Sequence, residues 1–328
     1  MSTWNTGSLL GLARQFMGTR VLLSAAELDV FTHLSTPKSL DEAVALLGTQ
    51  KRGTKILLDA LSAMGLLEKK EERYGCPPQH AALLSSSALE SVRPMILHSA
   101  SMWNRWAQLT DIVRTGEKED TPAGLYERDE LVAFIYAMHV VGREQAAETA
   151  VLAKAENARK LLDVGGATGS YAEAFAQYYP ELRATVFDRP LVIKMAEDRL
   201  ADSPVRDRID LAIGDFYDDP LPTGYDLVLL SAIIHQNSPE QNVALQKKCF
   251  DALESGGRIL IRDHLLSPDR THPVSGALFA VNMLVGTEGG NAYSFEDVQD
   301  SLSAAGFERI AKLHDDTHMD GLVEAYKP

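Results

Sequence analysis

The first hundred residues distribute apolar and polar positions with the period of a helix. Apolar residues repeat at three- and four-residue spacing, which predicts a buried helix face: Leu9, Leu12, Ala13, Phe16, Val21, Leu22, Ala25 and Leu28. Ser39 and Glu42 form a capping box that opens another helix, and Gly48 ends it. Segment 54–65 predicts a third helix and 66–76 two short strands around a charged turn. Helices followed by such a wing predict a winged-helix unit.

The periodicity of apolar and polar positions changes in the second half of the chain. Residues 101–158 remain helical and rich in aromatic residues, whereas from residue 159 short apolar runs alternate with helical segments. Apolar strands of this kind belong in a parallel sheet covered on both faces. The predicted strands are 160–164, 183–187, 209–213, 225–231 and 257–263, with helices at 171–178, 190–200 and 239–253. Two later runs, 307–313 and 321–326, have a hairpin-length gap and predict an antiparallel pair.

Composition and charge narrow the classes of protein. A chain of 328 residues, 45% hydrophobic and 24% charged, suits about two folded domains. The net charge of −14 disfavours nucleic acid and anionic membranes as partners. Cys76 and Cys249 lie far apart without a CxxC pattern, which implies neither disulfide framework nor structural zinc. The start of the chain lacks secretory features and no apolar run approaches twenty residues, so we expect a cytoplasmic protein without a membrane partner.

A winged helix also raises the question of DNA binding. The helix that would enter a groove is preceded by Lys51 and Arg52 and contains Lys55, but Asp59 follows and its other positions are mostly apolar. A helix that reads DNA needs polar or basic side chains facing the groove. This helix therefore has the composition of a packing element.

The stretch LLDVGGATGSY, residues 161–171, connects the first predicted strand of the sheet to its first helix. Ligands of open α/β sheets bind outside the carboxyl ends of the strands. Gly165, Gly166 and Gly169 fall at relative positions one, two and five, which is neither the dinucleotide fingerprint nor a P-loop. Asp163, just ahead, suits a positively charged amine. Together with the acidic residues at the ends of the next two strands, described below, this pattern describes a nucleoside without pyrophosphate that carries a cationic group.

Acidic residues also mark the ends of the next two strands. Asp188 follows Gly169 by nineteen residues, a suitable place to accept hydrogen bonds from ribose hydroxyls. Asp215 with Phe216 beside it suits an adenine, whose amine needs an acceptor and whose face needs an aromatic ring. As alternatives, the glycines serve only a tight turn and the two acids cap helices.

Five segments together resemble the class I S-adenosylmethionine-dependent methyltransferases of the caffeate and acetylserotonin O-methyltransferase type: DVGGATG, FDRP, GDFYDDPLP, YDLVLLSAIIHQ and LESGGRILIRDHLL. The resemblance covers nearly the whole chain. It implies an α/β fold in which residues 1–100 form a mainly helical winged-helix dimerisation domain. Residues 101–328 then form the methyltransferase domain, with a helical segment at 101–158 and a seven-stranded Rossmann-like core at 159–328. It further implies S-adenosylmethionine as cofactor, a small-molecule acceptor and a homodimer.

The resemblance implies cofactor contacts by Gly165, Asp188, Asp215 and Phe216. With the rest of the loop and the end of the fourth strand, the candidate cofactor residues become Asp163, Gly165, Gly166, Gly169, Asp188, Asp215, Phe216 and Ser231. A winged-helix regulator that senses S-adenosylmethionine is the alternative outside enzymes.

Methyl transfer from a sulfonium is an in-line displacement that aligns the acceptor and can require removal of its proton. By resemblance His235 is the general base, and Asp263 is the first of two supporting carboxylates, shortened from Glu. The second is expected where this chain has Ala292, and Glu288 is a candidate substitute. The alternative role for His235 is to cap the helix that begins near Pro239.

The acceptor pocket departs from that of lignin-pathway enzymes, because Ser231, Ala232, Gln236 and Asn237 replace the Lys, Trp and Asp-Trp of plant members. Acidic hydroxyl, sulfur and carbon acceptors all remain open, as does a fold retained for other chemistry. Candidate pocket residues, which also suit an ordinary core, are Trp103, Trp106, Phe134, Met138, Phe279, Asn282 and Met283. The acidic segment 314–321 contains two histidines, but we expect a solvated hairpin there and no metal site anywhere.

Overall fold

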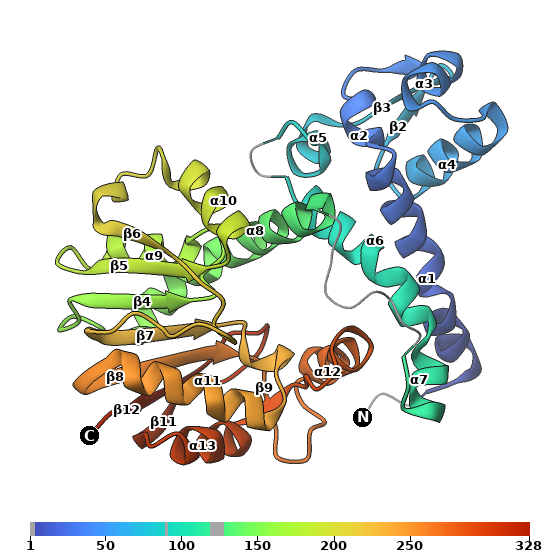
Figure 1. Cartoon of the computed structure of the whole chain (residues 1–328). Helices are drawn as coiled ribbons and strands as arrows, with labels where there is room; N and C mark the ends of the chain where they lie inside the picture. The colour runs from blue at the N-terminus through green and yellow to red at the C-terminus, as the bar shows by residue number, and fades with distance from the viewer. Residues whose placement is uncertain (1–3, 89–90, 119–127) are drawn as a thin grey trace. The chain divides into compact units, whose positions relative to one another are not determined.

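A computed structural model of the chain describes residues 4–88, 91–118 and 128–328 (Figure 1). The chain divides into two compact units. One comprises residues 1–104 and 122–140, and the other residues 105–121 and 141–328. The domain division at residues 100 and 101 stays a prediction, because neither unit is continuous in sequence.

The first unit is helical with a small antiparallel sheet. Its helices are α1 (Thr6–Glu27), α2 (Val30–His33), α3 (Leu40–Leu47), α4 (Lys51–Ala63), α5 (Pro78–Leu84) and α6 (Arg93–Ala107), whose last three residues belong to the second unit. The sheet has the order β1 (Lys38–Ser39), β3 (Arg73–Gly75), β2 (Glu68–Lys70). The predicted capping box is present at Ser39 and Glu42, and Gly48 ends α3 with φ of 62°. Helices and wing thus form as the sequence predicts.

The apolar face of α1 departs from the prediction of a buried helix. Leu9, Leu12 and Phe16 are 51%, 49% and 53% exposed. Only the last two turns are buried within the chain, at Leu23, Ala25 and Ala26. The reason is that the core of this unit packs on the carboxyl-terminal part of α1, around Phe31, Leu34, Leu58, Leu61 and Tyr74. The amino-terminal half of α1 therefore presents an apolar surface to solvent.

The second unit contains a seven-stranded sheet in the order β11-β12-β8-β7-β4-β5-β6. The strands are β4 (Lys160–Val164), β5 (Arg183–Asp188), β6 (Ile209–Ile213), β7 (Tyr225–Ser231), β8 (Leu253–Asp263), β11 (Glu308–His314) and β12 (Gly321–Tyr326). All pairs are parallel except those of β12, which is antiparallel to both neighbours. The predicted fold class and the antiparallel pair are confirmed, and β8 begins four residues earlier than predicted.

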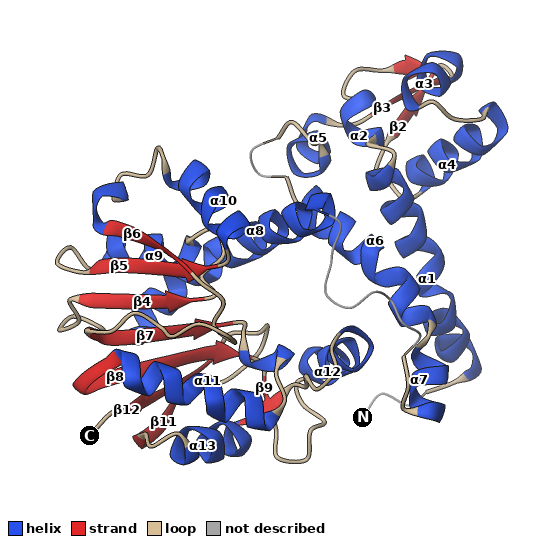
Figure 2. Ribbon diagram, viewed as in Figure 1, coloured by secondary structure: helices blue, strands red, loops and turns tan. Residues whose placement is uncertain are grey.

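Helices cover both faces of this sheet (Figure 2). On these faces lie α9 (Ser170–Tyr178), α10 (Pro190–Leu200), α11 (Pro239–Ala252), α13 (Phe295–Ala304) and the carboxyl-terminal part of α8 (Arg128–Ala153), whose first residues belong to the other unit. The unit also contains α7 (Leu109–Thr115) and α12 (Val274–Gly286). Two single-turn helices, η1 (Arg206–Arg208) and η2 (Ile234–Gln236), and a two-stranded pair, β9 (Leu265–Leu266) and β10 (Tyr293–Ser294), complete it. Among the described residues, no helix has the length and apolar character needed to cross a membrane.

Alternate strand residues enter two separate cores. Leu161, Leu229 and Leu260 pack against α8, α9 and α10, whereas Leu162 and Ile261 pack against α11 and α13. This is the period of two expected for strands covered on both sides. This alternation determines which face of the sheet each residue at a strand end occupies. The chain order reverses at β4, which lies between β7 and β5, and this switch point is where such sheets bind ligands.

Candidate cofactor and catalytic site

The glycine-rich loop follows β4 at the switch point. Gly165, Ala167 and Gly169 have φ of 69°, 50° and 79°, so left-handed backbone recurs at every second residue. The N–H of Gly165 donates to the carbonyl of Phe187 at 2.8 Å, and that of Gly169 donates to the carbonyl of Gly166 at 2.8 Å. Gly165 and Gly169 therefore permit a tight turn, and their role as cofactor contacts stays a prediction.

Gly166 is required for a different reason. A Cβ at Gly166 would lie 2.7 Å from the Asp163 carboxyl carbon and 3.0 Å from Val186. At Gly165 a Cβ would lie 2.5 Å from Ile233 and 3.3 Å from the ring of Phe216. Side chains from four strand ends therefore fill the space beneath the loop, and only bare backbone fits over them.

Asp163 is buried under the loop. Its carboxylate accepts a hydrogen bond from the N–H of Ala172 at 3.2 Å, at the start of α9. Burial raises the pKa of Asp163 to about 7, with the nearby Asp188 adding to the rise. A carboxyl group in this condition has a large electrostatic gain available from a cation beside it.

Asp188 and Asp215 follow β5 and β6. Asp188 accepts hydrogen bonds from the N–H groups of Ala167 at 3.0 Å and Arg189 at 2.8 Å, and burial raises its pKa. Arg189, not Asp188, is the cap residue of α10, so the capping alternative is wrong for Asp188. Asp215 accepts from the N–H of Tyr217 at 2.9 Å and so stabilises a turn. The half-buried ring of Phe216 follows it on that turn.

His235 lies in η2, just beyond β7. Its Nδ1 is 2.9 Å from each carboxylate oxygen of Asp263, at the end of β8. Burial alone would raise the pKa of Asp263, but the charge and hydrogen bond of His235, with the N–H of His264, lower it overall. Ser238 caps α11, so the capping role for His235 is wrong. An ionised Asp263 accepts the Nδ1 proton and leaves Nε2 as the basic atom.

The loop that carries Ala292 supports His235 through backbone. The N–H of Asn291 donates to the His235 carbonyl at 2.9 Å, and a Cβ on Gly290 would lie 2.4 Å from that oxygen. Ala292 is fully buried. Glu288 is exposed, and within the described ranges it makes neither hydrogen bond nor ion pair with His235. Asp263 is accordingly the carboxylate that the structure brings to this histidine.

A second histidine–aspartate pair lies next to the first. Nδ1 of His264 is 2.6 Å from Asp316, and both side chains are buried. The ring of Phe279, on α12, lies between the two histidines, 4.8 Å from His235 and 4.9 Å from His264 between centroids. The prediction of a wholly solvated hairpin at 314–321 is therefore wrong for Asp316. The position of His264 directly after Asp263 was the only signal in the sequence that could have pointed to this histidine. Nothing in the sequence identified Asp316 as the partner of His264.

The predicted pocket residues divide between the two units. In the second unit, the indole N–H of Trp106 donates to Asn282 at 2.9 Å, and Met283 is buried on the same helix. The remaining three belong to the first unit, where Arg20 lies over the ring of Trp103, and Phe134 contacts a histidine ring. Met138 is half-buried there. Phe279 is brought against His235 by an edge contact between the two rings.

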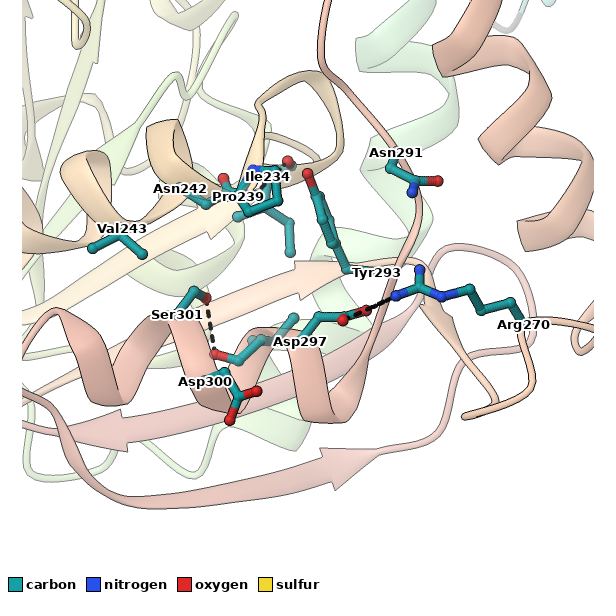
Figure 3. A pocket seen from close by; sticks show the side chains of 11 residues that line it. Ile234, Pro239, Asn242, Val243, Arg270, Asn291, Tyr293, Asp297, Asp300 and Ser301 are labelled. Atoms are coloured by element: carbon teal, nitrogen blue, oxygen red, sulfur yellow. Dashed lines mark hydrogen bonds and ion pairs between the residues drawn. The ribbon is translucent and has the colours of Figure 1, made fainter. Parts of the chain in front are cut away.

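A cavity of about 360 Å³ lies elsewhere in the second unit (Figure 3). It is lined by residues of η2, α11, α13 and the segments before them, including Ile234, Tyr293 and the ion pair of Arg270 with Asp297 at 2.7 Å. No candidate cofactor residue lines it, nor does His235 or Asp263. Within the described part of the chain, no group of His, Cys, Asp and Glu could hold a metal ion.

Known proteins agree with this geometry. The chain is 33% identical over 313 residues to the 3-hydroxy-5-methyl-1-naphthoate 3-O-methyltransferase of Streptomyces sahachiroi, covering 92% of this chain and 89% of that one. It is 32% identical over 312 residues to the tetracenomycin polyketide synthesis 8-O-methyl transferase TcmO of Streptomyces glaucescens, covering 93% and 92%. The crystal structure of human N-acetylserotonin methyltransferase in complex with SAM matches with a TM-score of 0.85 at 26% identity, covering 100% and 99%.

The seven-stranded sheet and its glycine-rich loop define a class I methyltransferase. Family models assign residues 10–86 to an O-methyltransferase dimerisation domain and residues 106–308 to an O-methyltransferase domain. The chain belongs to the S-adenosylmethionine-dependent O-methyltransferases that act on hydroxyl groups of small molecules. The predicted family, fold and cofactor are confirmed.

The described residues fit S-adenosylmethionine. The backbone at Gly166 is bare because a Cβ has no room, and the loop N–H of Ala167 already orients Asp188. Asp163 offers a buried carboxyl group to a cationic group. Aromatic surface at Phe216 stands beside the acidic end of β6. We propose that these residues, with Gly165, Gly169 and Asp215, hold the cofactor.

Proposed function

We propose that His235 is the general base for methylation of an acidic hydroxyl on an aromatic small molecule. The observation that carries the proposal is the bond from Nδ1 of His235 to Asp263, with Nε2 left to accept a proton. The cofactor supplies a methyl group on a positively charged sulfur. The chain itself then has to orient the hydroxyl, exclude water and accept the hydroxyl proton at Nε2.

The acidity of the acceptor follows from the support that His235 receives. Asp263 is the carboxylate in contact with its ring, and Phe279 covers the ring by an edge contact. A base with one supporting carboxylate is best matched to a phenolic hydroxyl, whose proton leaves more readily than that of an alcohol. The aromatic side chain beside the base, Phe279, favours a flat acceptor. One relative is named for 3-O-methylation of a hydroxynaphthoate, and another for 8-O-methylation in tetracenomycin polyketide synthesis.

The first experiment measures the cofactor site. Calorimetric titration with S-adenosylhomocysteine is compared between the wild type, Asp188→Ala and the control Asp210→Ala. Asp210 is an exposed acid of the neighbouring strand β6. We expect micromolar binding that Asp188→Ala abolishes and Asp210→Ala leaves unchanged. Absence of binding to the wild type would contradict the cofactor assignment.

The second experiment identifies the accepting atom. The protein with S-adenosylmethionine is incubated with a panel of phenols, aliphatic alcohols, thiols and activated carbon acids, and products are located by mass spectrometry and NMR. We expect methylation of aromatic hydroxyls. Methylation only of sulfur or carbon would contradict the proposed acceptor while leaving the cofactor site intact.

We also propose that the protein is a homodimer that buries the amino-terminal half of α1. Large apolar side chains gather on this helix and just before it, and they are exposed in the single chain: Trp4, Leu9, Leu10, Leu12, Phe16 and Met17. An apolar surface of this density is typical of a permanent interface. Light scattering should give twice the 35.9 kDa of one chain. Phe16→Glu should shift the mass toward the monomer, whereas Val113→Glu, at an exposed position on α7, should not.

Both cysteines support a reducing location. Cys76 and Cys249 are buried free thiols, and burial raises the pKa of each. Such thiols are unreactive core residues. We propose the cytoplasm as the site of action, and fractionation of cells that express the protein would test this.

A further inference from the structure

Asn237 is a buried side chain that is hydrogen-bonded on both of its polar atoms. It directly follows η2, two residues after His235, and it is fully buried. Its side-chain N–H donates to the side-chain oxygen of Asn242 at 3.0 Å, and its side-chain oxygen accepts from the hydroxyl of Tyr217 at 2.5 Å. A buried amide is costly unless it is paired in this way. Asn237 is therefore held in one orientation beside the turn that carries the base.

Two further bonds attach this turn to the elements around it. Asn242, on α11, donates its side-chain N–H to the carbonyl of Ile234 at 3.0 Å. The hydroxyl of Tyr293, on β10, donates to the carbonyl of Asn237 at 2.5 Å (Figure 3). Neither Asn242 nor Tyr293 is among the proposed cofactor residues, so these bonds hold the turn whether or not a ligand is present.

Tyr217 reaches the same turn from the proposed adenine contacts. It directly follows Asp215 and Phe216, and the rings of Phe216 and Tyr217 lie 4.6 Å apart between centroids. Its ring is 46% exposed, yet its hydroxyl reaches the buried amide of Asn237. Burial raises the pKa of Tyr217 and the charge of Asp215 adds to the rise, so the hydroxyl keeps its proton and remains a donor. One hydrogen bond thus joins the turn after β6 to the turn after β7.

Lys248, on α11, holds the turn after β6 as one unit. Its ammonium group donates to the carbonyls of Phe216 at 2.9 Å, Tyr217 at 2.7 Å and Asp219 at 2.9 Å. These three bonds use all three protons of the ammonium group. The N–H of Asp215 also donates to the carboxylate of Asp219 at 2.8 Å. A ligand that stacks on Phe216 therefore acts on Tyr217 through a turn that resists deformation.

We propose that Tyr217 is a positioning residue, whose hydrogen bond to Asn237 makes the turn that carries His235 respond to the cofactor. In-line methyl transfer requires the methyl carbon, the acceptor oxygen and the base to be aligned at one time. The cofactor residues locate the methyl carbon and η2 locates the base, so a bond between the two turns fixes one with respect to the other. This inference goes beyond the proposed function and rests on it, because it takes the proposed cofactor residues and the proposed base as given.

The expected coupling follows from local opening of the two turns. S-adenosylhomocysteine binds the closed form of the turn after β6, so it lowers the population in which that turn is open. The bond from Tyr217 to Asn237 then breaks less often, and η2 opens less often as well. The effect is limited to the worth of one buried hydrogen bond, up to about tenfold in an opening equilibrium.

The test measures hydrogen exchange of the full-length protein with and without saturating S-adenosylhomocysteine. Mass spectrometry follows peptides that cover residues 215–219 and 232–238. The proteins are the wild type, Tyr217→Phe and the control Tyr225→Phe. The control also removes a tyrosine hydroxyl from a hydrogen bond, to Thr185 at 3.0 Å, but at the start of β7. Circular dichroism and thermal unfolding establish that each variant is folded, and calorimetric titration gives its affinity for S-adenosylhomocysteine.

In the wild type and Tyr225→Phe we expect S-adenosylhomocysteine to slow exchange in both peptides, by about fivefold or more at 232–238. In Tyr217→Phe the slowing at 215–219 should remain, whereas the slowing at 232–238 should fall to within about twofold. Affinity for S-adenosylhomocysteine should change by less than about twofold, because η2 is mostly closed with or without the bond.

Turnover gives a second readout, which a purely structural role would not move. With an aromatic hydroxyl acceptor, Tyr217→Phe should lower kcat by about tenfold and leave KM for the cofactor unchanged. In the His235→Ala background the same substitution should have no further effect, because the residue through which Tyr217 acts is then absent. An equal loss in both backgrounds would show that Tyr217 does not act through His235.

Three exchange and binding results overturn the link. The first is a wild type that binds S-adenosylhomocysteine without slower exchange at 232–238, a result that needs no variant to fold. The second is a Tyr217→Phe protein that responds as the wild type does. The third is a folded Tyr217→Phe protein with much weaker affinity for S-adenosylhomocysteine, which makes Tyr217 a cofactor contact.

Failure of the proposed function has different signatures. A wild type that does not bind S-adenosylhomocysteine contradicts the proposed cofactor residues together with the link. An unchanged rate in His235→Ala contradicts the proposed base even where the exchange results are as expected.

Discussion

Nδ1 of His235 lies 2.9 Å from both carboxylate oxygens of Asp263, and this relationship determines which nitrogen of the imidazole can take a proton. The carboxylate is fully buried at the end of β8, and its pKa is lowered below the ordinary value despite that burial. Asp263 is therefore ionised at neutral pH and accepts the Nδ1 proton. The lone pair is left on Nε2, the atom that faces away from Asp263.

His235→Ala should remove the base without disturbing the cofactor site. We expect affinity for S-adenosylhomocysteine to change little and turnover with an aromatic hydroxyl acceptor to fall by about a hundredfold or more. His318→Ala, at an exposed histidine in the β11–β12 connection, is the control and should keep full activity. An unchanged rate in His235→Ala would remove this residue from the mechanism.

Asp163 should make both stability and cofactor binding depend on pH near neutrality. Its pKa rises from an unfolded value near 4 to about 7, so the folded state holds the extra proton between these limits. The free energy of unfolding should therefore fall as pH rises from 4 to 7, by at most ~4 kcal/mol for about three pKa units. Asp163→Asn should lack this component when urea unfolding is measured at several pH values.

Cofactor affinity provides the second readout for Asp163. An ammonium group bound beside it favours the ionised carboxylate, so affinity for S-adenosylhomocysteine should increase as pH rises through 7. The increase should be absent for 5′-methylthioadenosine, which has no ammonium group. Equal pH profiles for the two ligands would be inconsistent with Asp163 as the ammonium partner.

Gly166→Ala should damage the loop although Gly166 is not in the left-handed region. The new Cβ meets the Asp163 carboxyl group at 2.7 Å, and Asp163 is too tightly packed to retreat. We expect a loss of about 1–3 kcal/mol in the free energy of unfolding and weaker cofactor binding. Gly53→Ala is the control, because nothing lies within 4 Å of its Cβ on the exposed side of α4. It should stabilise the protein by up to about 1 kcal/mol.

Phe279→Ala should separate orientation of the base from its chemistry. The ring contacts both His235 and His264, so its loss frees the imidazole to rotate about the Asp263 bond. We expect turnover to fall by about tenfold with little change in affinity for S-adenosylhomocysteine. Leu278→Ala, one position earlier and 57% exposed, is the matched control. A Phe279→Ala protein as active as Leu278→Ala would show that the ring plays no part in positioning.

The sheet and its loop could be predicted because local signals agree there. Continuous apolar runs such as 225–231 suit only buried strands, and Gly165 and Gly169 mark the turn between β4 and α9. Partners that meet from distant parts of the chain could not be predicted. The burial of Asp316 against His264 depends on how the β11–β12 hairpin folds over the end of β8.

The apolar periodicity of α1 shows a second limit of prediction from sequence. Its apolar repeat is real, but periodicity reports that a face is apolar and not which molecule covers it. Leu12 and Phe16 lie outside the core that the chain builds for itself. The same ambiguity affected Asp215, whose position after β6 suits a ligand contact and a turn equally.

Left-handed backbone at Gly165, Ala167 and Gly169 has an entropic consequence for the cofactor. Each of these residues is fixed by folding, through hydrogen bonds from the loop to β5 and within the loop itself. Ordering one residue costs about 1–2 kcal/mol, and here that cost is incurred before any ligand arrives. Binding can then proceed without an ordering penalty in the loop, which preserves affinity for a flexible ligand with several rotatable bonds.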